Sequence, residues 1–170
     1  VVVLKDGEVI GALALRDVAR NDAKNALAEL KKLNIMPVML TGDADRVAKR
    51  MAKELGMEYR AELMPEDKLD ALTALRDDPK RSGPVAMVGD GINDAPALAC
   101  AHASMSPATA AEISQNAADI VFQGDRLGAV IEAIDVARKA DRLVRQNFAL
   151  SFAYNLITIP LAVSGFVTPL

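Results

Sequence analysis

Two carboxylates and an amide follow a short apolar stretch in the middle of the chain. Val85–Val88 has the length and composition of a buried strand, and residues 89–94 (Gly-Asp-Gly-Ile-Asn-Asp) come directly after it. The glycines allow a sharp turn and a close approach of the backbone to a ligand. Asp90 and Asp94 supply hard oxygen ligands, with Asn93 between them. This arrangement at the carboxyl end of a strand is typical of Mg²⁺ held beside a phosphate. The alternative is an acidic loop in which Asp94 is only a helix N-cap.

Two earlier segments also carry groups that suit phosphoryl transfer, which needs charge neutralisation, positioning and an in-line nucleophile. Residues 41–43 (Thr-Gly-Asp) follow the apolar stretch Ile35–Leu40. The Thr41 hydroxyl and the Gly42 amide can donate hydrogen bonds to phosphoryl oxygens. Lys68 follows a proline and supplies a fixed positive charge. Taken alone, Lys68 would be interpreted as a solvated lysine on a helix surface.

The three segments together resemble P-type ATPases, cation pumps with a haloacid dehalogenase-like phosphorylation domain. The hinge motif G-D-G-x-N-D-x-P-A-L matches residues 89–98, T-G-D matches 41–43 and P-x-x-K matches 65–68, in the same order and at similar spacing. The resemblance covers essentially the whole chain and implies Mg²⁺ as cofactor and ATP as substrate. The catalytic residues that it implies are Thr41, Gly42, Asp43, Lys68, Asp90 and Asn93, with Asp90 and Asp94 binding Mg²⁺.

The resemblance extends to one more pair of residues, but other motifs of the family are absent from the sequence. Asp17 and Arg20 are similar to the Asp-x-x-Arg that lines the nucleotide side of the family's phosphorylation domain. The nucleophile motif D-K-T-G-T does not occur in this sequence, nor do the family's T-G-E and His-Pro motifs. In family order these precede Val1, so we expect the remaining partners to be N-terminal domains of the same pump. The chain alone is then expected neither to form an aspartyl phosphate nor to transport.

Composition narrows the function classes further. The chain has 170 residues and a net charge of −3, and it lacks Trp, so nothing indicates binding to nucleic acid. Cys100 and His102 are the single cysteine and the single histidine, which excludes disulfides within the chain and metal sites built on several cysteines or histidines. We expect Cys100 to be a small buried apolar residue.

Strand-like and helix-like segments alternate along the chain. Val1–Leu4 and Val9–Leu15 predict a hairpin around an Asp-Gly turn. Beyond them, apolar strands alternate with amphipathic helices, and Ser106-Pro107 has the signature of another helix start. The pattern favours an α/β fold, with a haloacid dehalogenase-like, Rossmann-like parallel sheet flanked by helices.

The C-terminal stretch Phe148–Leu170 contains no charged residue, which is long enough for one membrane crossing of roughly 20 residues. A basic cluster precedes it: Arg138, Lys139, Arg142 and Arg145. By the positive-inside rule, we expect residues 1–147 on the cytoplasmic side of the cell (inner) membrane, and lipid as a partner. The predicted parts are the phosphorylation domain over 1–125, a connecting helix over 126–147 and a transmembrane helix over 148–170. A buried core helix is the alternative.

The pair Tyr154-Asn155 lies within this apolar stretch. An amide at membrane depth usually faces a transport pathway or a neighbouring helix. The pair is similar to that of copper-transporting heavy-metal (type IB) P-type ATPases, which implies Cu(I) as the transported cation. Residues 102–107 (His-Ala-Ser-Met-Ser-Pro) resemble the bacterial copper exporters associated with cytochrome oxidase assembly.

Two other functions compete with that of a pump. A stand-alone haloacid dehalogenase-like phosphatase would need a nucleophile within the chain, and Asp17 is the one candidate at a strand end. Such phosphatases use D-x-D, but residue 19 is Ala. The other possibility is a non-catalytic, membrane-anchored module that retains affinity for Mg²⁺ or nucleotide.

Overall fold

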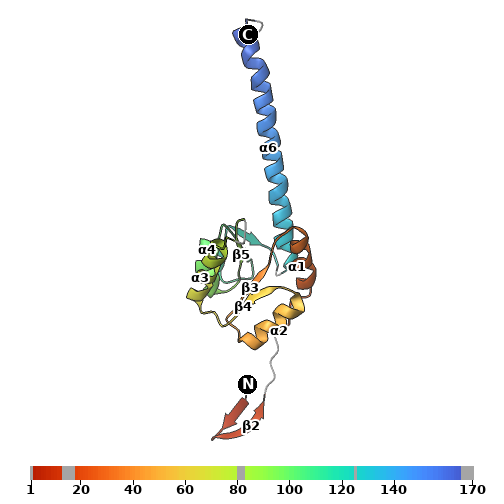
Figure 1. The fold of residues 1–170 in the computed structure, drawn as a ribbon. Helices are drawn as coiled ribbons and strands as arrows, with labels where there is room; N and C mark the ends of the chain where they lie inside the picture. Colours follow the sequence, from red (N-terminus) through yellow and green to blue (C-terminus); the bar gives the residue numbers. More distant parts are fainter. Residues whose placement is uncertain (1, 13–17, 80–82, 125, 166–170) are drawn as a thin grey trace. The chain divides into compact units, whose positions relative to one another are not determined.

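The computed structural model describes residues 2–12, 18–79, 83–124 and 126–165. It divides into two units, Val1–Leu127 and Gly128–Leu170, which are described separately (Figure 1).

The predicted hairpin is present. Strands β1 (Val2–Lys5) and β2 (Glu8–Ala12) pair in antiparallel fashion, with Lys5 opposite Glu8. Asp6 and Gly7 form the two-residue loop with φ values of 50° and 85°. Both values are positive, as the tight turn of a hairpin requires, and Asp-Gly is the sequence that adopts them most readily. The end of the predicted second strand, residues 13–15, lies outside the described residues.

A first parallel pair follows. Helix α1 (Ala23–Lys32) precedes strand β3 (Val38–Leu40), and helix α2 (Asp45–Leu55) connects β3 to strand β4 (Glu58–Arg60). A helical crossover of this kind allows two consecutive strands to run parallel, and Val38 is paired with Glu58. Gly56 ends α2 in the left-handed conformation with φ 63°, as its position after Leu55 predicts.

A second parallel sheet has the order β5-β6-β7. Helix α3 (Pro65–Arg76) leads to β5 (Ala86–Val88), and a 3₁₀ turn η1 (Ile92–Asp94) runs into helix α4 (Ala95–Cys100). Strand β6 (Ala103–Pro107), helix α5 (Glu112–Ala117) and strand β7 (Ile120–Phe122) complete the unit. The alternation of strands and helices therefore produces the predicted α/β fold with parallel strands.

Two local predictions are wrong. Ser106-Pro107 does not begin a helix, because both residues belong to β6 and Ser106 is fully buried. A residue before proline is biased towards extended backbone, which fits the end of a strand as well as a helix start. Cys100 is exposed, since the buried side of α4 carries Ala97 and Leu98 instead.

The core beneath the second sheet is made by α3, β5 and α4. Leu72 and Leu98 are each 1% exposed and pack with Met87 and Ala97. Each buried leucine contributes about 1.5–3 kcal/mol relative to an exposed one. This cluster fixes α3 and α4 against β5, so the residues at the start of α3 and those directly after β5 are held together.

The second unit is dominated by helix α6 (Gly128–Val163), 36 residues long. Its apolar side chains beyond Arg145 are exposed, Phe148 at 73% and Phe152 at 70%. Among the described residues, no helix has both the length and the apolar character needed to cross a membrane. The span predicted over 148–170 is thus not confirmed. The uncharged part of α6 from Phe148 to Val163 is shorter than the roughly 20 residues of one membrane crossing. Residues 166–170 lie outside the described part.

Candidate functional site

The strongest polar contact of the site joins α3 to the turn after β5. The Lys68 ammonium donates to Asp94 Oδ1 at 2.7 Å, and the two side chains are only 15% and 11% exposed. Pro65 is the first residue of α3, as predicted, and the Met64 amide donates to the Asp67 carboxylate at 2.8 Å, which caps the first turn. Lys68 is therefore not a solvated surface lysine: its charge is held beside a buried carboxylate.

Two glycines make room for that carboxylate. The Gly91 amide donates to Asp94 Oδ2 at 3.2 Å, so both Asp94 oxygens are engaged. A Cβ at Gly89 would lie 2.7 Å from Asp94 Cβ, closer than real atoms approach. Gly89 thus serves close packing rather than an unusual backbone angle, and any larger residue would displace Asp94.

Asp90 lies in a different environment from Asp94. Its side chain is 61% exposed and forms an ion pair with Arg20 at 3.2 Å. Arg20 comes from the segment before α1, 70 positions earlier in the chain. Asp17, the other residue predicted on the nucleotide side, lies outside the described residues.

Thr41, Gly42 and Asp43 form a compact turn after β3. The Thr41 hydroxyl donates to Asp43 Oδ2 at 2.9 Å, and the Asp43 amide donates back to Thr41 Oγ1 at 3.1 Å. The Leu63 amide donates to the Thr41 carbonyl at 3.1 Å, which ties this turn to the segment leading into α3. In the described part of the chain, no hydrogen bond or ion pair joins Thr41 or Asp43 to Asp90 or Asp94.

Asn93 and the carboxylates differ in how they are held. Asn93 is exposed in η1, and Asp94 is oriented by Lys68 and Gly91 rather than by Asn93. No group of three or more His, Cys, Asp or Glu able to hold a metal occurs among the described residues. Mg²⁺ commonly binds through one or two carboxylates together with water and phosphate. Asp90, exposed and anionic, with Asp94 beside it, fits that requirement.

Ser114 is a residue of the site that sequence reasoning missed. Its side chain is fully buried, and its hydroxyl donates to the Gly91 carbonyl at 2.5 Å. A single serine within a short helix carries no motif, so only the fold could reveal this contact.

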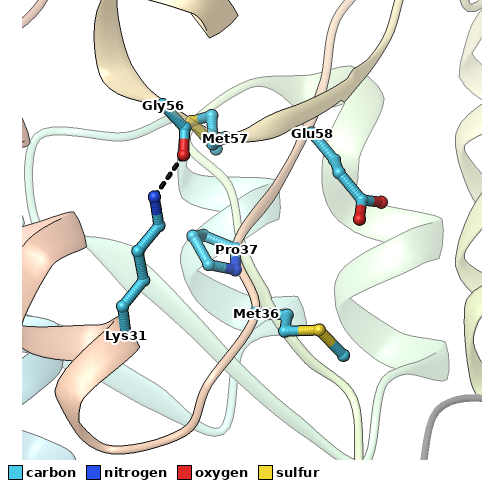
Figure 2. A pocket seen from close by; sticks show the side chains of 6 residues that line it. All are labelled: Lys31, Met36, Pro37, Gly56, Met57 and Glu58. Atoms are coloured by element: carbon cyan, nitrogen blue, oxygen red, sulfur yellow. Dashed lines mark hydrogen bonds between the residues drawn. The ribbon is translucent and has the colours of Figure 1, made fainter.

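A pocket is lined by residues from the ends of α1 and α2, the segment before β3 and the start of β4. It has a volume of about 410 Å³, and none of the predicted site residues lines it. Figure 2 shows Lys31 of α1 reaching the Gly56 carbonyl at the end of α2, with Met36 and Met57 nearby. A lysine that binds a last-turn carbonyl stabilises the end of the helix, so this contact serves the fold.

Comparison with known proteins finds a matching family model and similar curated proteins. The family model for "haloacid dehalogenase-like hydrolase" matches residues 1–102. The chain is 43% identical over 169 residues to a copper-exporting P-type ATPase of Staphylococcus epidermidis, covering 99% of this chain and 21% of that protein. It is 45% identical over 171 residues to the nitrogen fixation protein FixI of Bradyrhizobium diazoefficiens, covering 100% of this chain and 23% of that one.

A solved structure is also similar. The crystal structure of a zinc-transporting PIB-type ATPase in the E2.Pi state has a TM-score of 0.86 and 36% identity, covering 98% of this chain and 27% of that chain. The predicted resemblance to heavy-metal P-type ATPases is thereby confirmed. The chain spans about a fifth to a quarter of the length of these proteins.

Proposed function

This chain belongs to the haloacid dehalogenase-like hydrolase family, and we propose that it is the Mg²⁺- and phosphoryl-binding part of an ATP-driven heavy-metal cation pump. The observation that carries the proposal is the buried Lys68–Asp94 pair, anchored to Gly91 directly beside the exposed Asp90. In support of the proposal, one fixed cation and two carboxylates are the groups that a phosphate and its Mg²⁺ require.

Each residue has a distinct part in this proposal. Asp90 would hold Mg²⁺, which supplies charge neutralisation for the phosphoryl oxygens. Asp94 keeps a negative charge next to that position and holds the Lys68 ammonium, which attracts the equatorial oxygens. The Gly42 amide donates a hydrogen bond to the phosphoryl group, and the Thr41 hydroxyl does so by turning its proton from Asp43 to a phosphoryl oxygen. Arg20 is close enough to Asp90, at 3.2 Å, to steer the nucleotide phosphates towards it.

The reaction is the formation and breakdown of an aspartyl phosphate from ATP. The nucleophile is not in this sequence, which has no D-K-T-G-T, and we assign it to another part of the pump. Asp43, hydrogen-bonded to Thr41, holds that hydroxyl in place for the transferred phosphoryl group. Asn93 is exposed and available to a phosphoryl oxygen.

We assign Cu(I) as the transported cation, with Tyr154 and Asn155 of α6 contributing to its route. The 43% identical relative is named a copper exporter, whereas the 36% identical structure is named a zinc transporter, so the sequence comparison favours copper. Soft Cu(I) prefers thiolate and thioether ligands, and these must come from other helices of the pump. We place the first unit on the cytoplasmic side of the cell membrane.

The experiment is to replace Asp90 by Asn in the complete pump and to measure phosphoenzyme formed from ATP against Mg²⁺ concentration. Removal of one charge at a site built on electrostatics should slow phosphoenzyme formation roughly hundredfold. Asp77→Asn is a matched control, since Asp77 is 62% exposed and paired with Arg76 at 2.9 Å, much as Asp90 is with Arg20. Wild-type rate and Mg²⁺ dependence in Asp90→Asn would refute the assignment.

A further inference from the structure

Residues at the start of α5 donate hydrogen bonds to the backbone of the loop that carries both carboxylates. Ser114 Oγ donates to the Gly91 carbonyl at 2.5 Å, and the Ala111 amide lies 3.4 Å from the Asp90 carbonyl, to which it donates. Ser114 is 0% exposed. The loop is therefore held by α5 as well as by Lys68, and α5 carries none of the family motifs.

Gly91 is the point where the two carboxylates are coupled. Its carbonyl accepts the Asp94 amide at 2.9 Å as well as the Ser114 hydroxyl, and its own amide donates to Asp94 Oδ2. The carbonyl belongs to the Gly91–Ile92 peptide unit and the amide to the Asp90–Gly91 unit, so hydrogen bonds restrain both units that meet at Gly91. A rotation of either unit would change the position of Asp90 relative to Asp94.

Asp90 has little else to fix its position. It lies between two glycines, which restrict the backbone least of all residues. Among the described residues its side chain is paired with Arg20 alone, in an exposed ion pair of the kind that contributes little in water. The position of Asp90 relative to Asp94 must therefore come from the backbone that α5 holds.

We propose that Ser114 is a positioning residue, whose hydroxyl orients the Gly91 peptide and so sets Asp90 and Asp94 for Mg²⁺. The inference rests on the proposed function of those carboxylates. It assigns to Ser114 a role beyond filling the core. Loss of the Ser114 hydroxyl should then weaken Mg²⁺ binding without abolishing phosphorylation at saturating Mg²⁺.

The structure offers a matched control in Ser106. This serine is also 0% exposed and lies in β6 next to β5, and no described residue forms a hydrogen bond with its hydroxyl. Ser106→Ala removes the same atom from an equally buried position but breaks no hydrogen bond. It should be neutral for Mg²⁺, because removing an unsatisfied polar group carries no loss.

The test compares Ser114→Ala and Ser106→Ala in the complete pump. We expect Ser114→Ala to raise the Mg²⁺ concentration for half-maximal phosphoenzyme formation roughly threefold to tenfold, the range for one lost hydrogen bond. The maximal phosphoenzyme level should stay within about twofold of wild type. Ser106→Ala should leave both quantities unchanged.

A second measurement does not use Mg²⁺ at all. Amide hydrogen exchange in the metal-free pump, measured by mass spectrometry on peptides covering residues 89–98, should be faster in Ser114→Ala and unchanged in Ser106→Ala. Ser114 is only a core residue if Ser114→Ala changes neither the Mg²⁺ concentration for half-maximal phosphoenzyme formation nor the rate of amide exchange. The same conclusion follows if both serine variants behave alike. If wild type needs no Mg²⁺ for phosphorylation, the proposed function fails and the inference fails with it.

Discussion

Lys68 shows how its surroundings decide what a residue does. As one of 20 basic residues in the chain it has no distinguishing chemistry. Its side chain is 15% exposed and its partner Asp94 is 11% exposed. A buried pair of charges contributes little net stability, but breaking it is expensive, since the remaining charge stays buried without compensation.

We therefore expect Lys68→Met to destabilise the first unit by about 3–5 kcal/mol, because the Asp94 carboxylate would be left buried without its cation. Urea unfolding of the chain, followed by circular dichroism, measures this change. The double variant Lys68→Met/Asp94→Asn should recover most of the loss, since the buried charge is then gone.

Lys24→Met provides the comparison. Lys24 pairs with Glu54 at 3.2 Å, but the side chains are 61% and 43% exposed, so the loss should be under about 1 kcal/mol. Equal losses of stability in Lys24→Met and Lys68→Met would show that burial of the Lys68–Asp94 pair has no energetic consequence.

At the residue scale, the motifs single out candidate side chains but do not predict what each one contacts. Lys68 was found from its place after Pro65, and its contact with Asp94 follows from the fold. Arg20 lies 70 positions from Asp90 and Ser114 lies 23 from Gly91. Neither pair leaves a local pattern, because such contacts arise only when strands and helices from distant parts of the chain come together.

At the scale of elements, a buried leucine helps to position α3. Leu72 is 1% exposed and packs against Leu98 of α4 and Met87 of β5. This contact holds the helix that carries Lys68 against the elements that carry Asp94. The hydrophobic cluster therefore also maintains the geometry of the site.

Leu72→Ala should reduce the free energy of unfolding by about 2–5 kcal/mol, from lost burial and from the cavity left behind. Urea unfolding of the chain measures it. Leu143→Ala, on the exposed side of α6 at 59%, should change stability by less than about 0.5 kcal/mol. A small effect of Leu72→Ala would mean that α3 is held mainly by Lys68.

The elements themselves were largely predictable, and the exceptions have physical causes. Glycines after Leu55 and in the hairpin turn adopt the positive φ values that their positions demand. Ser106-Pro107 was wrongly predicted to start a helix, because Ser-Pro is compatible with both a helix start and an extended strand end. Only pairing with β7, where Ser106 lies opposite Val121, decides between them.

At the scale of the whole molecule, the chain has the groups proposed to surround a phosphoryl group but no D-K-T-G-T motif. Incubated with ATP and Mg²⁺, the chain alone should take up no acid-stable phosphate and should not hydrolyse phosphate esters. Labelled ATP followed by acid precipitation measures this. Phosphate uptake that disappears in Asp17→Asn would contradict the prediction and would favour a stand-alone phosphatase.

The transported ion is also a question for the whole pump, and Asn155 addresses it. Tyr154 is 65% exposed on α6, and its carbonyl accepts the Thr158 hydroxyl at 2.9 Å. Pro160 lies inside the same helix and removes one backbone hydrogen bond there. The helix is thus loosened next to an exposed amide and phenol, a combination suited to a cation route.

In the intact pump, Asn155→Ala should lower Cu(I)-stimulated ATP hydrolysis several-fold while phosphorylation by inorganic phosphate stays near wild type, because the role proposed for this side chain is in transport alone. Leu156→Ala, an apolar exposed neighbour at 64%, should leave both activities unchanged. If both activities fall together with protein yield in Asn155→Ala, the amide stabilises helix packing instead, and if Zn²⁺ rather than Cu(I) stimulates wild type, the assignment of copper is wrong.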